Sequence, residues 1–168
     1  RPQELAEKAR ILPKDIEWHF IGHLQTNKIK LILPCVSLVQ SVDSLHLLQE
    51  LDRKAGATEK TLECLLEVHI SREDSKQGFR PEEIREIVGS RDKFRNVILR
   101  GVMGMASFSD DESLVRKEFR LLKKVFSDVR AEGFDTISMG MSSDYRLAVE
   151  EGTNLVRIGT SIFGERKI

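Results

Sequence analysis

Short β-rich segments alternate with helix-forming segments along the whole chain, and this alternation constrains the fold more than any other feature. Apolar runs rich in Val, Ile and Leu are each followed by an amphipathic segment, and Gly or Pro residues separate the two kinds. Strands that alternate with helices pair in parallel through right-handed crossovers, which gives an α/β sheet or barrel. The sequence predicts parallel strands at residues 16–22, 36–42, 62–70, 97–105, 136–141 and 155–160.

Helices are predicted between these strands from their capping and stop signals. Pro13 ends the first, and Pro34 ends a second, because proline cannot continue a helix. Pro81 suits the first turn of another helix. The predicted helices cover residues 3–12, 25–33, 44–55, 81–88, 111–132 and 142–152.

The number of strands leaves two architectures open. A closed (β/α)₈ barrel needs eight strands and typically about 250 residues, whereas this chain shows six. The fold is therefore either an open doubly wound sheet or a barrel whose first strands lie before Arg1. In both cases residues 1–168 are expected to form one α/β domain.

The composition of the 168 residues argues against several kinds of protein. Lys plus Arg and Asp plus Glu both number 27, so the chain has no net charge that would concentrate nucleic acid or an anionic membrane. No apolar run approaches the ~20 residues of a membrane span, and no secretory signal opens the sequence. Two isolated cysteines, Cys35 and Cys64, favour a reducing, cytoplasmic compartment, and Cys64 is expected in the core.

Candidate binding residues follow the last two predicted strands, because parallel α/β folds bind ligands at the carboxyl ends of strands. Ser142 follows one strand and precedes a helix, so its hydroxyl and the free N–H groups of the first helical turn suit an anion. An ordinary N-cap serine is the alternative. In the motif RIGT, Gly159 permits close backbone approach and Thr160 supplies a hydroxyl. The two elements together favour a phosphate site.

Arg157 lies two residues before Gly159, so strand alternation predicts that both lie on one face. If that face points into the site, Arg157 is a fixed cation beside the ligand. The alternative is an ion pair with a glutamate or aspartate across the barrel.

The histidines indicate a metal site only weakly. His19 and His23 have the spacing of side chains on one strand face, but a metal would need a third ligand such as His69. No carboxylate cluster accompanies them, so no metal is expected.

Four segments together resemble a known family. WHFIGHLQTNK (18–28), SREDSKQGF (71–79), SMGMSSDYRLAVEEG (138–152) and VRIGTSIFGER (156–166) are similar to the pyridoxal-phosphate homeostasis proteins, which are single-domain relatives of the alanine racemase N-terminal barrel. The resemblance covers essentially the whole chain. It implies a parallel (β/α)₈ TIM-type barrel with pyridoxal 5′-phosphate at the carboxyl ends of its strands. This small-molecule cofactor is the partner it implies, and a monomer is compatible with it.

The resemblance also implies roles for individual residues. Ser142, Gly159 and Thr160 match residues that hold the cofactor phosphate, and Met141 matches one that lines the site. Arg157 matches an arginine that faces the pyridine nitrogen. An always-charged arginine there keeps the ring nitrogen unprotonated and the ring a weaker electron sink, which fits limited carbanion chemistry.

One part of the family pattern is missing. The family carries its Schiff-base lysine at the end of the first strand, in a segment like AVSKTKP, and a strand like FGENY follows; neither occurs in this sequence. We therefore expect about two βα units, on the order of 60 residues, to precede Arg1 in a complete family member. No catalytic residue and no Schiff-base lysine is assigned. Lys28 and Lys76 are the nearest candidates, and neither is expected to end a strand that faces Arg157.

Three functions compete. The first is binding and homeostasis of pyridoxal phosphate without evident turnover. The second is an amino-acid racemase, which needs a base on each face of the substrate α-carbon, whereas Tyr145 is the only tyrosine. The third is a cofactor-free barrel enzyme acting on a sugar phosphate, which would need a lysine or paired carboxylates at strand ends. Asp43 and Glu67 come near this pattern, but spacing does not pair them. The sequence favours the first function.

Overall fold

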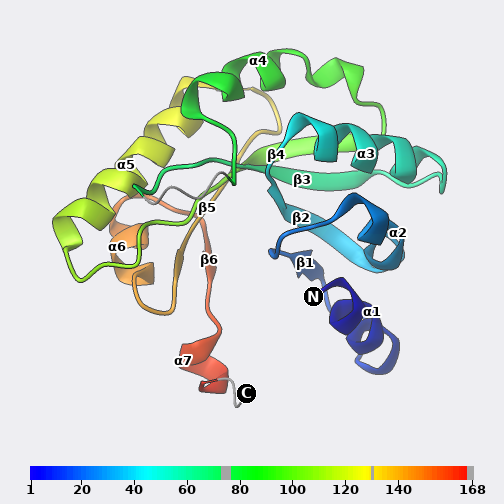
Figure 1. Cartoon of the computed structure of the whole chain (residues 1–168), viewed down its shortest axis with the longest axis horizontal. Helices are drawn as coiled ribbons and strands as arrows, with labels where there is room; N and C mark the ends of the chain where they lie inside the picture. Colours follow the sequence, from blue (N-terminus) through cyan, green and yellow to red (C-terminus); the bar gives the residue numbers. More distant parts are fainter. Residues whose placement is uncertain (73–76, 130, 166–168) are drawn as a thin grey trace.

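The computed structural model describes residues 1–72, 77–129 and 131–165 and contains one sheet of parallel strands (Figure 1). Each strand pairs with the next along the chain, from the first to the sixth. The parallel pairing that the alternation predicted is confirmed, and the sheet is an open part of a barrel whose edges are the first and last strands. The strands are β1 (Trp18–Phe20), β2 (Val36–Val42), β3 (Leu62–Glu67), β4 (Val97–Met103), β5 (Thr136–Met141) and β6 (Leu155–Arg157).

Two strands have the predicted bounds and four are shorter. β2 and β5 coincide with their predicted ranges, and β4 ends two residues early. β3 stops at Glu67, because the chain then turns and Val68 forms only a single bridge to Phe79. β6 stops at Arg157, because Gly159 already caps a helix, so the prediction of a strand as far as residue 160 is wrong.

The helices lie between the strands, as predicted, but several are shorter or begin as 3₁₀ turns. Ser44 caps its helix by accepting a hydrogen bond from the Leu47 N–H at 3.3 Å. Pro81 opens a 3₁₀ turn that leads into a helix. None of the helices in the described ranges combines the length and apolar character of a membrane span. The helical elements are α1 (Pro2–Ile11), η1 (Thr26–Lys28), α2 (Ile29–Ile32), α3 (Leu45–Gly56), η2 (Pro81–Glu83), α4 (Ile84–Gly89), η3 (Arg91–Lys93), α5 (Glu112–Asp128), α6 (Tyr145–Glu150) and α7 (Thr160–Phe163).

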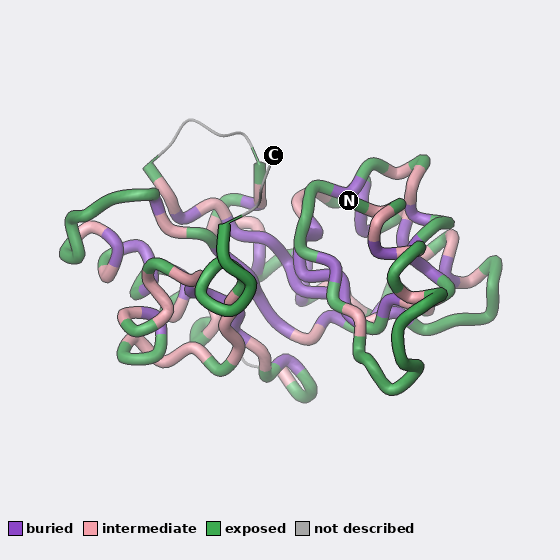
Figure 2. The backbone as a smooth tube through the Cα atoms, turned by 90° about the horizontal axis from the view of Figure 1, so that it is seen from below, coloured by how far each residue is buried: buried purple, intermediate pink, exposed green. Residues whose placement is uncertain are grey.

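The main core fills the space between the outer face of the sheet and the helices, and Figure 2 shows buried segments mainly in the interior and exposed segments at the periphery. Cys64 belongs to this core and is fully buried, as predicted. The inner face carries a smaller apolar cluster of Leu38, Leu65 and Met103, against which Leu155 packs.

On the same strands, the next side chains that face inward are polar. Gln40, Glu67 and Arg157 each lie two residues beyond Leu38, Leu65 and Leu155, and strand alternation keeps such pairs on one face. The inner face of the sheet is therefore apolar toward the start of the strands and polar toward their carboxyl ends.

Candidate functional site

A cavity of about 850 Å³ opens at the carboxyl ends of β5 and β6. Most of its lining comes from β6, from the end of β5 and from the residues that follow these two strands. The other lining residues are His19 on β1, Ile21 just after it, Gln40 on β2 and Phe108. The structure thus brings all the predicted cofactor residues to one place. Those that line the cavity are Met141, Ser142, Arg157, Gly159 and Thr160.

The Ser142 hydroxyl connects the two predicted phosphate elements. Its Oγ accepts hydrogen bonds from the Gly159 N–H at 3.2 Å and from the Ser161 N–H at 3.3 Å. A Cβ added at Gly159 would meet nothing within 4 Å, so the backbone is open to the cavity on that side. One hydroxyl and the first amides of the α7 turn therefore lie together at the cavity, and groups of these kinds bind phosphate oxygens in proteins.

The helix next to Ser142 differs from the one predicted. α6 begins only at Tyr145, and its N-cap is Asp144, whose Oδ1 accepts a hydrogen bond from the Met141 N–H at 2.6 Å. The prediction that Ser142 directly precedes the α6 helix is therefore wrong. The amides that converge with its hydroxyl belong to α7.

Arg157 extends into the polar inner region and is held by two acceptors. Nη1 donates to Ser138 Oγ at 2.7 Å, and Nη2 donates to the Gly104 carbonyl at 3.0 Å. Among the described residues it forms no ion pair, so that alternative is wrong. Burial lowers the pKa of the guanidinium, and the negative charges of Asp144 and Glu67 oppose this shift.

Sequence reasoning missed the residues that support Arg157. Ser138 Oγ donates to Gln40 Oε1 at 2.6 Å, and Gln40 Nε2 lies 3.1 Å from His19 Nδ1. Ser138 and Gln40 are 0% and 2% exposed. The available signal was a polar residue among the apolar residues of each strand, because buried polar groups need partners.

His19 and His23, which share a strand spacing in the sequence, have different partners in the structure. β1 ends at Phe20, so His23 lies outside the strand, where its Nδ1 contacts Asp43 Oδ2 at 3.2 Å, while His19 contacts Gln40. No group of three or more His, Cys, Asp or Glu side chains in the described ranges is placed to hold a metal.

Two carboxylates that spacing did not pair lie close enough to interact. Glu67 is 7% exposed, and burial together with the negative charge of Asp43 raises its pKa. The positive charges of Arg157 and His23 oppose this shift. The inner face of the sheet therefore holds charges of both signs near the carboxyl ends of the strands.

Of the two lysines singled out from the sequence, only Lys28 lies in the described part of the chain, and it does not line the cavity. Lys28 ends η1, and Lys76 lies outside the described residues. The absence of a Schiff-base lysine from this chain stays a prediction.

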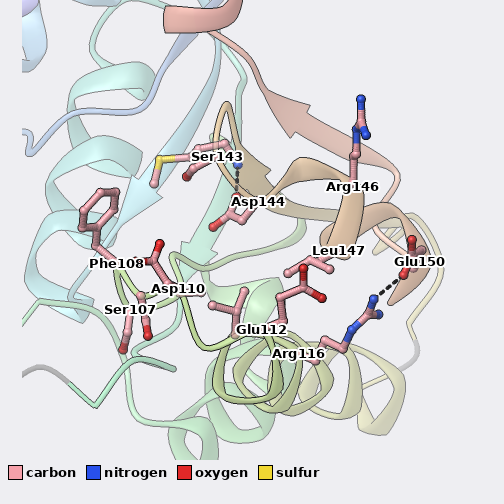
Figure 3. A pocket seen from close by; sticks show the side chains of 14 residues that line it. Ser107, Phe108, Asp110, Glu112, Arg116, Ser143, Asp144, Arg146, Leu147 and Glu150 are labelled. Atoms are coloured by element: carbon pink, nitrogen blue, oxygen red, sulfur yellow. Dashed lines mark hydrogen bonds and ion pairs between the residues drawn. The ribbon is translucent and has the colours of Figure 1, made fainter.

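A second cavity of about 540 Å³ lies between α5, α6 and the segment around Phe108 (Figure 3). Of the two arginines in its wall, Arg116 pairs with Glu150 and Glu151, and Arg146 donates a hydrogen bond to the Tyr145 hydroxyl. Asp110 and Glu112 add negative charge to the wall. A phosphate is therefore better accommodated by the cavity at Ser142.

Comparison with known proteins identifies the family of this chain. Residues 3–167 match the family described as "Alanine racemase, N-terminal domain". Proteins named "Pyridoxal phosphate homeostasis protein" from Aquifex aeolicus and Pseudomonas aeruginosa are 37% and 35% identical over 99% and 98% of this chain. The chain spans 75% and 71% of those two relatives, and 66% of a Pasteurella multocida relative that is 34% identical.

Solved structures show the same fold. PipY of Synechococcus elongatus without pyridoxal phosphate superposes with a TM-score of 0.89 at 32% identity, covering 98% of this chain and 79% of that one. The PipY structure with pyridoxal phosphate bound gives 0.85 at 30% identity over the same shares. An alanine racemase of Clostridium difficile, only 16% identical, shares the fold with a TM-score of 0.75 over 100% of this chain and 43% of that one. Because the family match covers nearly every residue of this chain, and more than a third of the aligned residues are identical in the two relatives named first, this chain belongs to the alanine racemase N-terminal domain family, among the pyridoxal phosphate homeostasis proteins.

Proposed function

We propose that this chain binds pyridoxal 5′-phosphate in the cavity at Ser142 and serves cytoplasmic vitamin B6 homeostasis as a binding protein rather than as an enzyme. The convergence of Ser142 Oγ with the Gly159 and Ser161 amides carries the proposal, because it joins the two predicted phosphate elements. The relatives named pyridoxal phosphate homeostasis proteins, and the PipY structure with the cofactor bound, support it.

The residues present fit this cofactor. Ser142 and the amides around Gly159 and Thr160 would hold the phosphate, and Met141 would lie beside the cofactor. Arg157 would face the pyridine nitrogen as a permanent hydrogen-bond donor. When bound, the cofactor supplies an aldehyde that reacts with amines and a ring that withdraws electrons. Arg157 limits the second property, because a guanidinium only donates hydrogen bonds and cannot accept one from a protonated ring nitrogen.

The surroundings of the cavity disfavour racemisation. A racemase needs two bases on opposite faces of the substrate, but Tyr145 is not among the lining residues, and no lysine of the described ranges is. Tyr145 instead accepts a 3.4 Å hydrogen bond from Arg146 Nε on α6. These residues therefore bind the cofactor without supplying a pair of bases.

Equilibrium dialysis with pyridoxal phosphate tests the proposal. The unmodified chain should bind one equivalent, and Ser142→Ala should weaken binding by ~10-fold or more, since a hydrogen bond to a charged group contributes about 1.5–3 kcal/mol. Ser127→Ala removes an exposed serine hydroxyl from α5 and should bind like the unmodified chain. When the protein loaded with pyridoxal phosphate is incubated with L-alanine, the alanine should remain the L enantiomer.

Two results would contradict the proposal. One is saturation by inorganic phosphate without measurable binding of pyridoxal phosphate, which would favour a cofactor-free phosphate site. The other is an equal loss of affinity in Ser142→Ala and Ser127→Ala.

A further inference from the structure

We propose that Ser138 and Gln40 are positioning residues that set the orientation of the Arg157 guanidinium through a hydrogen-bond chain ending at His19. The chain runs from Arg157 on β6 through Ser138 on β5 and Gln40 on β2 to His19 on β1. The inference rests on the proposed function, because it concerns how the arginine is presented to the cofactor ring.

The chemistry of the four groups fixes the direction of every bond. A guanidinium only donates, so Ser138 Oγ accepts from Nη1 and keeps its own hydrogen for Gln40 Oε1. With its oxygen used in this way, Gln40 turns its NH₂ group toward His19 Nδ1. His19 Nδ1 must then be the acceptor, which places the proton of the neutral ring on Nε2. All three donors therefore point from Arg157 toward His19.

The anchors hold the guanidinium plane at two points. Nη1 is bound by Ser138 and Nη2 by the Gly104 carbonyl, so rotation about the end of the side chain breaks at least one bond. Two of the five N–H donors of the guanidinium are used in this way. The others have no hydrogen-bond partner among the described residues, and Arg157 lines the cavity. The arginine is thus fixed on one side while donors remain for a ligand.

Burial makes the bonds of this hydrogen-bond chain difficult to replace. Ser138 and Gln40 are almost completely enclosed, so water does not replace a lost partner easily. If Ser138 loses its hydroxyl, Arg157 keeps only the Gly104 carbonyl, and Gln40 is free to reverse its amide.

Two sets of variants separate positioning from a general packing role. Ser138→Ala removes the middle of the chain, and Gln40→Met removes both polar ends of the amide. Gln40→Glu keeps an acceptor for Ser138 but removes the N–H that points at His19. Ser41→Ala is the matched control. Ser41 is a buried serine of β2 whose hydroxyl donates to the Gly22 carbonyl at 2.6 Å, so it takes no part in the hydrogen-bond chain.

Nitrogen-15 NMR of the ligand-free protein provides the primary readout, and Arg157→Lys assigns the arginine signals. We expect separate, slowly exchanging Nη signals for Arg157 and a His19 ring protonated on Nε2. Ser138→Ala and Gln40→Met should merge the Nη signals, whereas Ser41→Ala should not. In Gln40→Glu the Nη signals should persist while the His19 proton moves to Nδ1, since a carboxylate only accepts there.

Pyridoxal phosphate binding is the second readout. Ser138→Ala should weaken binding ~3–10-fold and shift the absorption maximum of the bound cofactor, whereas the control Ser41→Ala should do neither. Unchanged Arg157 signals in folded Ser138→Ala, or a Gln40→Glu variant in which His19 keeps its Nε2 proton, would overturn the inference. If Ser138→Ala does not fold, the two Gln40 variants decide. If the unmodified protein binds no pyridoxal phosphate, the proposed function fails. The NMR result still decides whether the hydrogen-bond chain orients Arg157.

Discussion

Arg157 and Glu67 oppose each other's pKa shift across the inner face of the sheet without forming an ion pair. They lie two residues beyond Leu155 and Leu65, which belong to one apolar cluster. Arg157 has neutral acceptors, whereas the Glu67 carboxylate has no hydrogen-bond or ion-pair partner among the described residues. The site therefore keeps a cation in place without neutralising it by direct contact.

Glu67→Gln should make the protein more stable above the ordinary glutamate pKa, with a gain that grows as pH rises. Burial and Asp43 raise the pKa of Glu67 above its model-compound value of 4.5, so the folded state binds its proton more tightly than the unfolded chain does. Stability then falls as pH rises from about that value through the raised pKa, and glutamine removes this loss. Thermal unfolding at pH 4 and pH 8 should show a higher Tm for the variant at pH 8, by ~2 °C or more, and little difference at pH 4.

The control for this experiment is Glu63→Gln on the same strand. Glu63 is 42% exposed and pairs with Arg100, so its replacement should change stability by less than ~1 kcal/mol. A Glu67→Gln variant that is less stable than the parent at pH 8 would mean that the carboxylate is needed charged in the fold.

The two cysteines should differ in their reaction with a thiol reagent at pH 8. Cys64 is 0% exposed, and burial and the neighbouring charge of Glu63 raise the pKa of its thiol. Burial raises the pKa of Cys35 as well, but Lys60 opposes this shift and the side chain is only partly buried. Ellman's reagent should therefore modify Cys35 slowly in the native protein and Cys64 only in guanidinium chloride. A Cys35→Ser variant that reacts in the native state would contradict the core position of Cys64.

Gly140→Ala should destabilise the protein by about 2–4 kcal/mol. Gly140 has a φ of +94°, and an added Cβ would lie 2.6 Å from Ala148 Cβ and 3.0 Å from Tyr145 Cα. The close contact of β5 with α6 therefore has no room for a methyl group. Because Ser142 follows two residues later, the affinity for pyridoxal phosphate should fall too. Gly89→Ala is the matched control, since nothing lies within 4 Å of its added Cβ, and urea titrations should show it unchanged or slightly more stable.

Borohydride reduction of the chain loaded with pyridoxal phosphate should give no stoichiometric pyridoxyl adduct. The residues described around the cavity include no lysine, so binding should rest on phosphate contacts and be reversible. Mass spectrometry after proteolysis measures the adduct directly. A stoichiometric adduct on Lys28 or Lys76 would refute this prediction.

The sequence was sufficient for the fold class and for the group of residues around the cavity, but not for their local geometry. Alternation and the motifs GMS and RIGT predicted parallel strands and the convergence of Ser142 with Gly159. The cap and hydrogen-bond partner of each residue depend on where each strand ends, and tertiary contacts determine those ends. Periodicity cannot show that Asp144 takes the N-cap role of α6 or that Arg157 meets Ser138.

Long-range proximity was equally out of reach. Gln40 and Ser138 are 98 positions apart, and only the curvature of the whole sheet brings their side chains within 2.6 Å. The interaction of Asp43 with Glu67 depends instead on the register of two neighbouring strands, since Asp43 follows β2, Glu67 ends β3, and Val42 pairs with Leu66. A single sequence shows which face such residues occupy, but not their neighbours across the barrel.

The order of strand pairing has a consequence for how the protein is made. Every strand after β1 finds its partner in the strand that was synthesised just before it, so the sheet can grow one unit at a time as the chain leaves the ribosome. Most of the core residues belong to segments that emerge before β5 (Thr136–Met141). Ser142 and the α7 turn emerge last. A nascent chain therefore acquires most of its packed interior before it acquires its phosphate-binding residues.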